Sequence, residues 1–468
     1  MATKNQGQNA MEKITAFAKR RGFVFQSSEI YGGFSSCYDF GPLGVELKNN
    51  IKKAWWEEMT KKQDGIIGLD SSILMSPKVW QASGHLTAGF ADELAECKKC
   101  HKRFRLDEIL NSKTQNSQSK KAKKYQPEKT VCPECGGPMI EPRKFNLMIK
   151  ALVGPVQDTL TETYLRAETC QGIYVNFKNI WQSMRLKVPF GVVQVGKSFR
   201  NEITPKDFLF RTREFEQMEM QWFCHPKEAD KFFDYWLRER IKWLLSLGIK
   251  KENLRTVETQ KKDLAHYAKR AVDIEYRFPF GFKEIEGVHN RGDWDLSNHS
   301  KNSDQDLSCQ DDETKEKFIP HIIETSLGAD RLFFALLCDA FEEIKGGRTE
   351  TTESTKEVEI VLKLSKKLSP VKAAVLPLVK NKKAITKKAK EIYRQLKTSF
   401  VCQYDESGSI GRRYRRQDEI GTTAALTVDF KTLKDDTVTV RDRDTMKQKR
   451  VKISKIEKFI KDGLSNNI

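Results

Sequence analysis

One segment, residues 198–223, limits the fold most, because it places charged groups and aromatic rings side by side. Its sequence, SFRNEITPKDFLFRTREFEQMEMQWF, holds three arginines, four glutamates and several aromatic residues. The preceding FGVVQV is rich in β-branched residues, REFEQMEMQWF alternates polar with apolar residues, and ITPKDF between them contains a proline. This pattern predicts two β-strands joined by a loop.

Alternation along the two strands divides their side chains between two faces. The set that we expect to point into a core is Met218, Met220 and Trp222. The set that we expect on the opposite, polar face is Arg200, Glu202, Arg213, Phe215, Gln217 and Glu219. The second face would form a polar wall with one aromatic ring.

A polar wall of this kind suits a ligand that is anionic at one end, flat in the middle and cationic at the other. The planar guanidinium of arginine is always charged and matches phosphate oxygens. A phenyl ring suits a stacked base, and glutamates suit an ammonium group. The alternative is a ladder of surface ion pairs, which contributes little per pair.

Two further segments add groups of the same kinds. ETSLGADRLFFALL is expected to end a strand with Glu324 and Ser326, to turn at Gly328 and to begin a helix that carries Arg331. A helix N-terminus attracts phosphate. AETCQGIYVNF places Glu168 just before a glycine and a strand. Four arginines and three glutamates then fit ATP plus an amino acid, namely Arg200, Arg211, Arg213, Arg331, Glu168, Glu219 and Glu324.

With 468 residues the chain is long enough for about two to four domains. Its formal net charge of +19 indicates a polyanionic partner, nucleic acid before an acidic membrane, although a generally basic proteome would give the same charge. The beginning, MATKNQGQNA, lacks the apolar region of a signal peptide, and no apolar run approaches membrane-spanning length. Two CxxC pairs and six scattered cysteines fit a reducing cytosol. We therefore expect a cytoplasmic protein without a membrane partner.

Apolar spacing predicts the organisation of the remaining chain. Helices are expected over residues 11–20, 45–59 and 227–248, and short strands with polar turns over 171–223. Residues 347–358 form a polar linker. After it, strand and helix patterns alternate in VKAAVLPL, ITKKAKEIYRQLK, FVCQYD, AALTVDF and TVTVRDR, which predicts an α/β module of about 100 residues.

Several of these segments resemble one enzyme family. FRNE…RTREFEQME resembles motif 2 of the class II aminoacyl-tRNA synthetases, and ETSLGADR resembles motif 3. LDSSILMSPKVWQASGH, whose strand is expected to end at Pro77, resembles motif 1, which builds the dimer interface in that class. YDFGPLGVELKNNIKKAWW, RAETCQGIYVNF, FRNEITP and GSIGRRYRRQDEIG are similar to segments of dimeric glycyl-tRNA synthetases. The resemblance extends from about residue 11 to residue 460.

The resemblance implies an α/β (α+β) fold in two parts. Residues 1–350 would form a catalytic domain on an antiparallel sheet, with a Cys-rich insert at 97–135 and a largely helical insertion at 224–283. Residues 351–468 would form an α/β anticodon-binding domain. The implied enzyme is an aminoacyl-tRNA ligase and a homodimer. It would use ATP to convert glycine to glycyl-adenylate and transfer glycine to the 3' end of tRNA(Gly).

The resemblance also implies roles for single residues at the nucleotide. Arg200 would clamp the α-phosphate and stabilise the transition state, and it forms the expected catalytic pair with Arg331. Glu202 would contact the adenine amino group, and Phe215 would stack on adenine. Arg211 would join Arg331 at the outer phosphates. The expected ATP-binding set is completed by Asn201, Phe210, Thr212, Arg213, Ile285 and Gly328.

The expected metal and amino-acid contacts follow in the same way. Glu284, in KEIEG, would help to bind ATP and its Mg²⁺. The sequence departs from the family at Thr325, where proline is usual, and threonine is expected to loosen the glycine pocket without abolishing it. Among the seven histidines we single out only His85, for which we expect a structural role. The expected glycine-binding set is Arg105, Glu168, Phe215, Gln217, Glu219, Glu324 and Ser326.

Two CxxC pairs predict a zinc site. Cys97 and Cys100 form the first pair, and Cys132 and Cys135 the second. Four thiolates in such pairs can hold Zn²⁺ tetrahedrally. The 31 residues between the pairs exceed the usual spacing, but their polar middle could loop out, and four free thiols are the alternative. The other six cysteines are expected to be small core or incidental residues.

Two basic segments are candidates for contact with tRNA. GRRYRR, residues 411–416, interleaves arginine with tyrosine as an RNA-facing surface would. Alternatively it is the start of a helix, paired with Asp418 and Glu419. The basic loop 111–130 is a weaker candidate. For the whole chain, the alternatives are a non-catalytic synthetase-like binding protein and a class II specificity for serine, threonine or proline.

Overall fold

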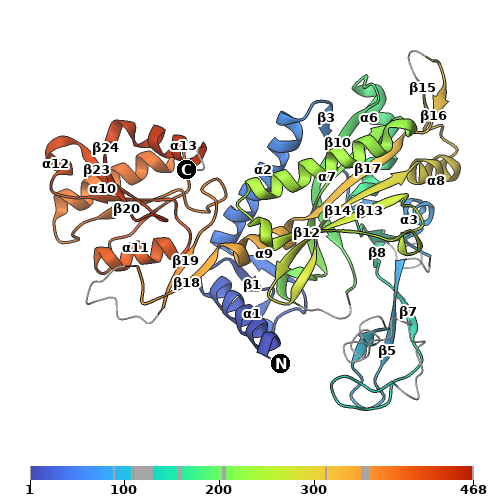
Figure 1. The fold of residues 1–468 in the computed structure, drawn as a ribbon, viewed down its shortest axis with the longest axis horizontal. Coiled ribbons are helices and arrows are strands. Elements are labelled where there is room, and N and C mark those ends of the chain that lie inside the picture. The colour runs from blue at the N-terminus through green and yellow to red at the C-terminus, as the bar shows by residue number, and fades with distance from the viewer. Residues whose placement is uncertain are drawn as a thin grey trace.

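The computed structural model describes residues 2–87, 90–106, 109, 130–155, 161–202, 207–310, 314–348 and 358–465. The chain forms a large body, from which a small cysteine-containing module extends, and a separate C-terminal body (Figure 1). Almost all of the basic loop 111–130 lies outside the described residues, as do most of the turn between the predicted strands and most of the predicted linker.

A seven-stranded sheet forms the centre of the large body. Its strand order is β12-β13-β14-β17-β11-β10-β3, and every pair is antiparallel except β3 with β10. The predicted hairpin is confirmed, because β10 and β11 pair from Phe190↔Phe223 to Phe199↔Glu214. The strands are β3 (Ile66–Gly68), β10 (Phe190–Phe199), β11 (Glu214–Cys224), β12 (Leu254–Glu258), β13 (Arg270–Phe278), β14 (Gly281–Gly292) and β17 (His321–Gly328).

Helices pack their apolar sides against one face of this sheet, with α7 lying across the strands (Figure 1). Met218 and Met220 of β11 are fully buried in this core, as predicted, together with Trp236 of α7. Behind β14, Arg240 of α7 donates from Nε to Oε1 of Glu286 at 2.5 Å, and both side chains are buried. The helices are α1 (Ala2–Arg20), α2 (Pro42–Lys62), α7 (Ala229–Ser246) and α9 (Ala329–Ala340).

Residues 170–183 are helical, so the prediction of strands from residue 171 is wrong at its beginning. They form α5 (Cys170–Val175) and α6 (Phe177–Ser183). Ile173, Phe177 and Ile180 are buried at spacings of four and three residues, which is the helical period. Glu168 therefore precedes a helix and not a strand.

Residues 224–283 are not largely helical either. Helix α7 confirms the helix predicted at 227–248, but strands β12 and β13 follow it and extend the central sheet. Val272, Ile274, Tyr276 and Phe278 are buried at every second position, which is the period of a strand with one face in the core.

Two small three-stranded sheets lie beside the large one. One, β6-β5-β7, belongs to the cysteine-containing module, and the other, β4-β9-β8, connects the module to the main body. Pro77 does not end a strand as expected. Strand β4 ends at Met75, and Pro77 begins helix α3 after the cap Ser76. The elements are β4 (Leu74–Met75), α3 (Pro77–Ala82), β5 (Ala91–Glu96), β6 (Arg103–Arg105), β7 (Arg143–Asn146), β8 (Ile149–Val153) and β9 (Thr161–Leu165).

The C-terminal body is the predicted α/β module. Its sheet has the order β21-β20-β22-β23-β24, in which β20 is parallel to β21 and β22 and the other pairs are antiparallel. The strands are β20 (Ala373–Pro377), β21 (Cys402–Tyr404), β22 (Ala424–Val428), β23 (Thr437–Asp442) and β24 (Gln448–Lys452). The helices are α10 (Lys383–Lys397), α11 (Ile410–Glu419), α12 (Thr432–Asp435) and α13 (Ile456–Ser465).

Short elements complete the described chain. Strand β18 of the large body pairs with β19, the first strand after the predicted linker. None of the described helices combines the length and the apolar character needed to cross a membrane. The remaining elements are β1 (Val24–Gln26), β2 (Tyr38–Phe40), α8 (Trp294–Ser303), β15 (Cys309–Gln310), β16 (Lys317–Phe318), β18 (Phe341–Lys345), β19 (Val358–Leu362) and the 3₁₀ turns at 29–31, 208–210, 226–228, 251–253, 261–263 and 453–455.

Candidate active site

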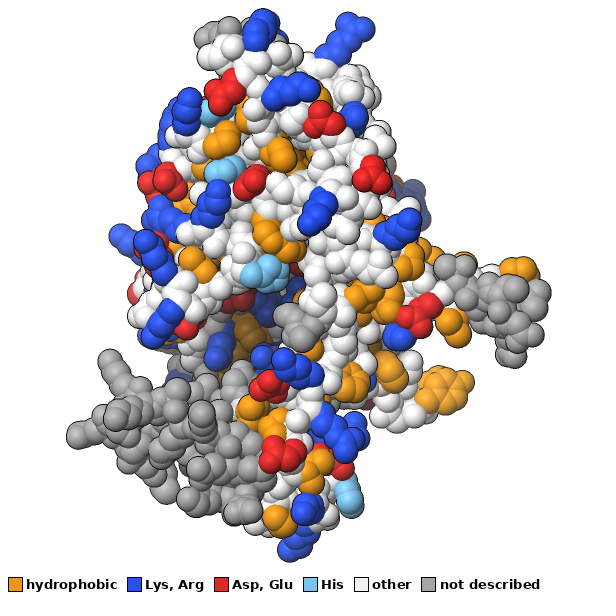
Figure 2. All heavy atoms as spheres, turned by 90° about the vertical axis from the view of Figure 1, so that its right-hand side faces the viewer, with side chains coloured by type: hydrophobic (Ala, Val, Ile, Leu, Met, Phe, Trp, Pro, Cys, Tyr) orange, Lys and Arg blue, Asp and Glu red, His pale blue; other side chains and the backbone are white. Residues whose placement is uncertain are grey.

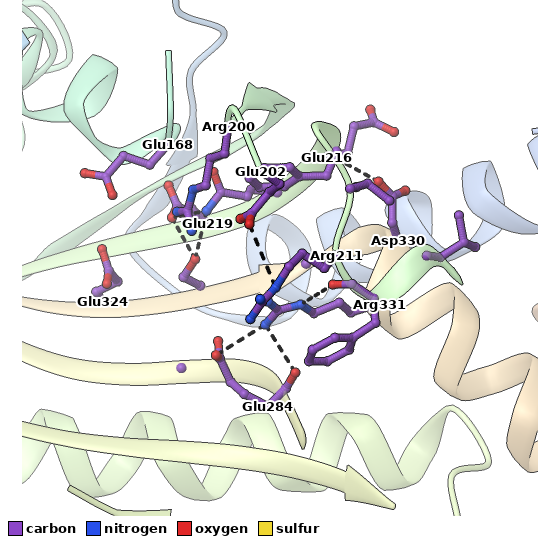
Figure 3. Close-up of a pocket in the computed structure, with 18 of the residues that line it drawn as sticks. Glu168, Arg200, Glu202, Arg211, Glu216, Glu219, Glu284, Glu324, Asp330 and Arg331 are labelled. Atoms are coloured by element: carbon purple, nitrogen blue, oxygen red, sulfur yellow. Dashed lines mark hydrogen bonds and ion pairs between the residues drawn. The ribbon is translucent and has the colours of Figure 1, made fainter. Parts of the chain in front are cut away.

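A pocket lies over strands β11, β17 and β14, on the face of the central sheet opposite α7, and the first turn of α9 lines it with Arg331 (Figure 3). Strand pairing sets its floor, since Ser326 is the register partner of both Glu219 and Gly287. The pocket brings together most of the predicted site residues, namely Glu168, Arg200, Glu202, Phe210, Arg211, Thr212, Phe215, Gln217, Glu219, Glu284, Glu324, Ser326, Gly328 and Arg331.

Four predicted residues do not line this pocket. Arg213 precedes β11, so strand alternation does not hold its side chain in place, and its guanidinium donates to the carbonyl oxygens of Glu202 and Ser35. Asn201 lines a neighbouring hollow, and Ile285 is buried in the core. Arg105 lies on β6 and donates to Asp92 at 3.0 Å. Within β11, Phe215, Gln217 and Glu219 line the pocket as predicted, and Glu216 near the start of the strand lines it too.

Glu219 lies in the centre of the acidic end of the pocket. Its Oε1 accepts from Ser326 Oγ at 2.7 Å and from Gln217 Nε2 at 3.1 Å, and its Oε2 accepts from the Thr169 hydroxyl. The side chain is buried, and the Glu324 carboxylate lies nearby. Burial and then the negative charge of Glu324 raise the pKa of Glu219 to about 8.

Glu324 is buried beside Glu219, but hydrogen-bond donors, among them the charged Arg291, contact its carboxylate. Its Oε1 contacts His289 Nδ1 at 2.8 Å, and its Oε2 accepts from Gln221 Nε2 at 3.0 Å. Arg291 Nη1 lies 3.3 and 3.2 Å from the two oxygens. Although burial alone would raise it, Arg291 and the His289 hydrogen bond lower the pKa of Glu324 to about 2. This carboxylate is therefore ionised at neutral pH.

Glu168 is the third carboxylate and is mostly buried. Its Oε1 accepts from Cys170 Sγ at 2.9 Å and from Gln171 Nε2 at 3.0 Å, and lies 3.3 Å from His85 Nε2. Burial opposes ionisation, but His85 holds the pKa of Glu168 well below its usual range. His85 is itself buried and bonded to Ser83 Oγ at 2.8 Å. Its contacts are those of a residue that supports the acidic end.

The basic end of the pocket holds arginines against aromatic rings. The Arg200 guanidinium lies 5.4 Å from the centre of the Phe215 ring, and its Nε donates to the Ala167 carbonyl oxygen at 3.2 Å. The Arg331 guanidinium lies 4.4 Å from the centre of the Phe210 ring. In both contacts a guanidinium group lies next to an aromatic ring. A ring can stack on a base and a guanidinium group can bind a phosphate, so this arrangement suits a nucleotide.

Two ion pairs cross the basic end (Figure 3). Arg331 Nη1 lies 3.2 Å from Oε2 of Glu284, and Arg211 Nε lies 3.9 Å from Oε2 of Glu202. The Glu284 side chain is about half-exposed, so its oxygens remain accessible from the pocket. A carboxylate oxygen is the kind of ligand that Mg²⁺ prefers. Glu284 therefore fits the predicted magnesium contact.

Sequence reasoning missed seven residues that line the pocket, namely Leu209, Glu216, Asp330, Tyr267, Gly287, His289 and Arg291. His85 was the only histidine that we singled out, yet His289 is the histidine that lines the pocket. The last three lie at alternate positions of β14, after the recognised Glu284. They are offset by one residue from the period that starts at Glu284, because the register of β14 with β13 shifts between Glu284 and Glu286.

Thr325, the departure from the family pattern, lies on the side of β17 away from the pocket. It lies between Glu324 and Ser326 on β17, is fully buried, and does not line the pocket. Its register partners are Met220 and Val288. The exchange of proline for threonine therefore acts on the core side of the strand.

The four predicted zinc ligands lie together in the cysteine-containing module. Cys97 Sγ is 3.5 Å from Cys135 Sγ, Cys100 Sγ is 3.7 Å from Cys132 Sγ, and all four sulfurs lie within 4.8 Å of one another. Sulfurs bound tetrahedrally to zinc at about 2.3 Å lie about 3.8 Å apart. The four thiols therefore fit Zn²⁺ in number and spacing.

Helix α11 contains the basic segment 411–416. Arg413 is buried and donates to the carbonyl oxygens of Pro377 and Gly408, and Arg416 donates to Asp405 at 2.6 Å. Tyr414 bonds to the Thr427 hydroxyl. These residues therefore have structural contacts, whereas Arg412 is exposed.

Asp418 and Glu419, the acidic partners predicted for residues 411–416, pair with arginines outside this segment. Asp418 binds Arg348 and Arg441, and Glu419 binds Arg20, the last residue of α1, and Arg21, which follows it. The helix-start interpretation is thus right about the helix and wrong about its partners, because α11 turns Asp418 and Glu419 toward other elements.

On the face of the molecule in Figure 2, Lys and Arg side chains are more numerous than Asp and Glu but are scattered among them.

Family models match both bodies of the chain. One, described as "tRNA synthetase class II core domain (G, H, P, S and T)", matches residues 154–340, which include all strands that form the floor of the pocket. The other, described as "Anticodon binding domain", matches residues 372–463. With the fold and the pocket, these matches define a class II tRNA synthetase with a C-terminal anticodon-binding domain, and they confirm the predicted fold class.

Curated relatives narrow the class to one family. Three of them carry the name glycine--tRNA ligase. The protein of Treponema denticola is 49% identical over 98% of each chain. The protein of Thermobifida fusca is 47% identical over 99% of this chain and 100% of its own, and that of Borreliella burgdorferi is 50% identical over 97% and 98%. The chain belongs to the glycine--tRNA ligase family.

Proposed function

We propose that this chain activates glycine with ATP and transfers it to the 3' end of tRNA(Gly). One observation carries the proposal, namely that a single pocket holds three carboxylates at one end and three arginines at the other. Carboxylates suit the ammonium group of an amino acid, and arginines suit the phosphates of ATP. Membership of the glycine--tRNA ligase family supports glycine as the amino acid.

The proposed first step joins the two substrates. A carboxylate oxygen of glycine attacks the α-phosphorus of ATP, the bond from that phosphorus to the bridging oxygen breaks, and pyrophosphate leaves. Arg200 binds the α-phosphate as its charge is redistributed, Phe215 stacks on adenine, and Arg331 binds the outer phosphates. Positioning and electrostatic stabilisation are sufficient for such a step, and a protein nucleophile is not required. Glu284 would hold the Mg²⁺, which offsets phosphate charge when bound.

The proposed second step transfers glycine to tRNA. A hydroxyl of the terminal ribose attacks the glycyl carbonyl and releases its proton to solvent, an ester forms, and AMP leaves with the electrons of the acyl–phosphate bond. The catalytic domain would extend to about residue 350, and the anticodon-binding domain would begin at 351. The matched models at 154–340 and 372–463 support this division, and the net charge of +19 supports tRNA as the partner.

The acidic end of the pocket also supports a mechanism of selection. Glycine offers no side chain to bind, so larger amino acids must be rejected by occupied space. Ser326 Oγ is held by Glu219 Oε1 at 2.7 Å, and Gln217 lies beside it. We propose that Glu168, Glu219 and Glu324 gather around the ammonium group and that Ser326 stands where a Cβ would project.

We also propose a homodimer in the cytoplasm and one structural zinc per chain. The similarity of residues 69–85 to motif 1 supports the dimer, and all ten cysteines are described and free of disulfides, which suits a reducing compartment. Zinc bound by the four thiols would hold the module together.

The zinc proposal makes a prediction of its own. Elemental analysis of purified protein should find about one zinc per chain. Replacing Cys132 and Cys135 by serine should release it and increase hydrogen exchange in residues 91–105. The double variant Cys224→Ser with Cys309→Ser serves as the control and should retain the metal. Protein without zinc and with a fully protected module would contradict the proposal.

The experiment that tests the proposed function is ATP–pyrophosphate exchange with each of the twenty amino acids. Glycine alone should support rapid exchange. Exchange driven best by serine, threonine or proline would assign another class II specificity. Failure of all twenty would favour a non-catalytic binding protein. A second assay, transfer of labelled glycine to tRNA, should depend on tRNA(Gly).

A further inference from the structure

Glu324 differs from the other two carboxylates in how completely protein groups hold it. Its oxygens contact His289, Gln221 and Arg291, which come from the two strands on either side of β17. Only about 5% of its side chain is exposed. The direction in which this carboxylate can face a substrate is therefore set by these three neighbours.

His289 is the most exposed of the three neighbours and lines the pocket together with Arg291. It is the register partner of Glu324 across β14 and β17, and about 21% of its side chain is exposed, whereas Arg291 and Gln221 are buried. Because an ionised carboxylate can only accept, His289 Nδ1 must donate the 2.8 Å hydrogen bond to Glu324 Oε1.

The sequence around His289 leaves room for its ring. A Cβ added at Gly287 would lie 2.7 Å from Cε1 and 3.0 Å from Nε2 of His289. Both residues line the pocket, and Gly287 is the register partner of Ser326. Charged groups surround the ring, with Arg291 and Glu284 from β14, Asp273 from β13 and Glu324 from β17. The ring is thus fixed between the acidic end of the pocket and Glu284 at the basic end.

We propose that His289 is a positioning residue of the amino-acid site, which holds the Glu324 carboxylate toward the substrate ammonium through its Nδ1–H donor. The proposal rests on the proposed function, since it assigns Glu324 to the amino acid. Without the donor, Glu324 would keep its contacts to Arg291 and Gln221 but could rotate toward them. The ammonium would then lose a well-aligned partner while the ATP contacts remained unchanged.

Three variants of His289 separate the loss of its Nδ1–H hydrogen-bond donor from a change in side-chain volume. In His289→Asn the amide nitrogen can occupy the place of Nδ1, in His289→Gln it reaches instead toward the place of Nε2, and His289→Leu has no donor. Steady-state exchange is measured at varied amino acid with saturating ATP, and the reverse. The KM for glycine should rise about tenfold or more in His289→Leu, as for a lost hydrogen bond to a charged group, while the KM for ATP stays within about twofold.

The ranking of the variants decides the result. His289→Asn should stay within about threefold of the wild type, and His289→Gln should be worse than His289→Asn. His321→Leu, at the start of β17, the strand that carries Glu324, and outside the pocket, is the control and should leave both KM values unchanged. Equal effects of the Asn and Gln variants, or a rise in the KM for ATP as large as that for the amino acid, would overturn the proposal.

The outcome can be separated from a failure of the proposed function. The amino acid used is the one that the wild type activates best among the twenty. A wrong substrate assignment therefore appears in the wild type, whereas a wrong role for His289 appears in the comparison of its variants. If His289→Leu does not fold, the comparison of His289→Asn with His289→Gln still decides.

Discussion

The two ends of the pocket hold their charges in different ways. At the acidic end, each of Glu168, Glu219 and Glu324 is fixed by contacts to three neighbouring residues. At the basic end, Arg331 and Arg211 face half-exposed or more distant carboxylates, at 3.2 and 3.9 Å. Arg331 also donates to the carbonyl oxygens of Phe210 and Glu284. We expect the carboxylates of the acidic end to keep their contacts when substrates bind, and the two ion pairs of the basic end to exchange, because phosphates compete for the same arginine donors.

This difference matches what the two substrates demand. An ATP molecule offers many charged atoms, so arginines can rearrange around it and still gain strong contacts. Glycine offers only an ammonium group, a carboxylate and the absence of a side chain. A rigid pocket can reject a larger substrate because overpacking adds strain. The three carboxylates of the acidic end must therefore keep their positions when the amino acid binds.

The largest effect is expected from Arg200, the arginine nearest to Phe215 at the basic end. Arg200→Ala removes an electrostatic contact that is strongest in the transition state, at a cost of about 3 kcal/mol or more. Exchange should fall by at least roughly a hundredfold, while circular dichroism and melting temperature stay close to those of the wild type. A near-normal rate would disprove its assignment to the α-phosphate.

The next effect separates the two ends directly. Glu324→Gln removes a charge from the acidic end, and its KM for glycine should rise about tenfold, more than its KM for ATP. Glu284→Gln is the matched change at the basic end and should raise the KM for ATP more than that for glycine. If Glu324→Gln weakened ATP alone, the acidic end would not be the amino-acid site.

A pH dependence should distinguish Glu219 from Glu324. Because its pKa is raised to about 8, Glu219 is protonated and neutral below that pH and becomes an anion above it. Most free glycine keeps its ammonium charge over this range, so ionisation of Glu219 should lower the KM for glycine by up to about tenfold between pH 7 and 9. Glu324, with a pKa of about 2, stays ionised and adds no such dependence.

The control for the pH dependence is Glu219→Gln, which cannot ionise. Its KM for glycine should be raised and should change little between pH 7 and 9. A wild-type profile that is flat, or that persists unchanged in Glu219→Gln, would assign the dependence to another group.

The smallest effect is expected at the wall that excludes a side chain. Ser326→Gly opens the space next to Glu219, so alanine or serine should support some exchange, at a rate a few times above the wild-type background. Added space normally changes discrimination by only about 1–3 kcal/mol. Exchange that remained wholly specific for glycine would show that another group excludes the Cβ.

Regular alternation made part of this site predictable. The hairpin of β10 and β11, with Met218 and Met220 in the core and Gln217 and Glu219 in the pocket, follows from the two-residue period. Arg213 did not follow, because the period begins only where the strand begins, at Glu214. Local pattern thus predicts faces within an element but not the point at which the element starts.

Strand β14 was harder to predict because it contains an irregularity. The register with β13 shifts between Ile274 and Glu275, so Glu284 and Gly287 both line the pocket although they are three residues apart. Simple alternation from Glu284 would place Glu286 in the pocket, but that residue pairs with Arg240 behind the sheet. His289 and Arg291 were missed for this reason, since a shift of register depends on the partner strand.

The most direct test of the two-ended pocket is a crystal structure with a non-hydrolysable analogue of glycyl-adenylate. The account predicts the ammonium group within hydrogen-bond distance of Glu219 and Glu168, the phosphate at Arg200, and adenine on Phe215, with Arg331 moved away from Glu284. The carboxylates of the acidic end should keep the contacts described above. An analogue bound in the opposite direction, or an ammonium group that contacts none of the three glutamates, would contradict it.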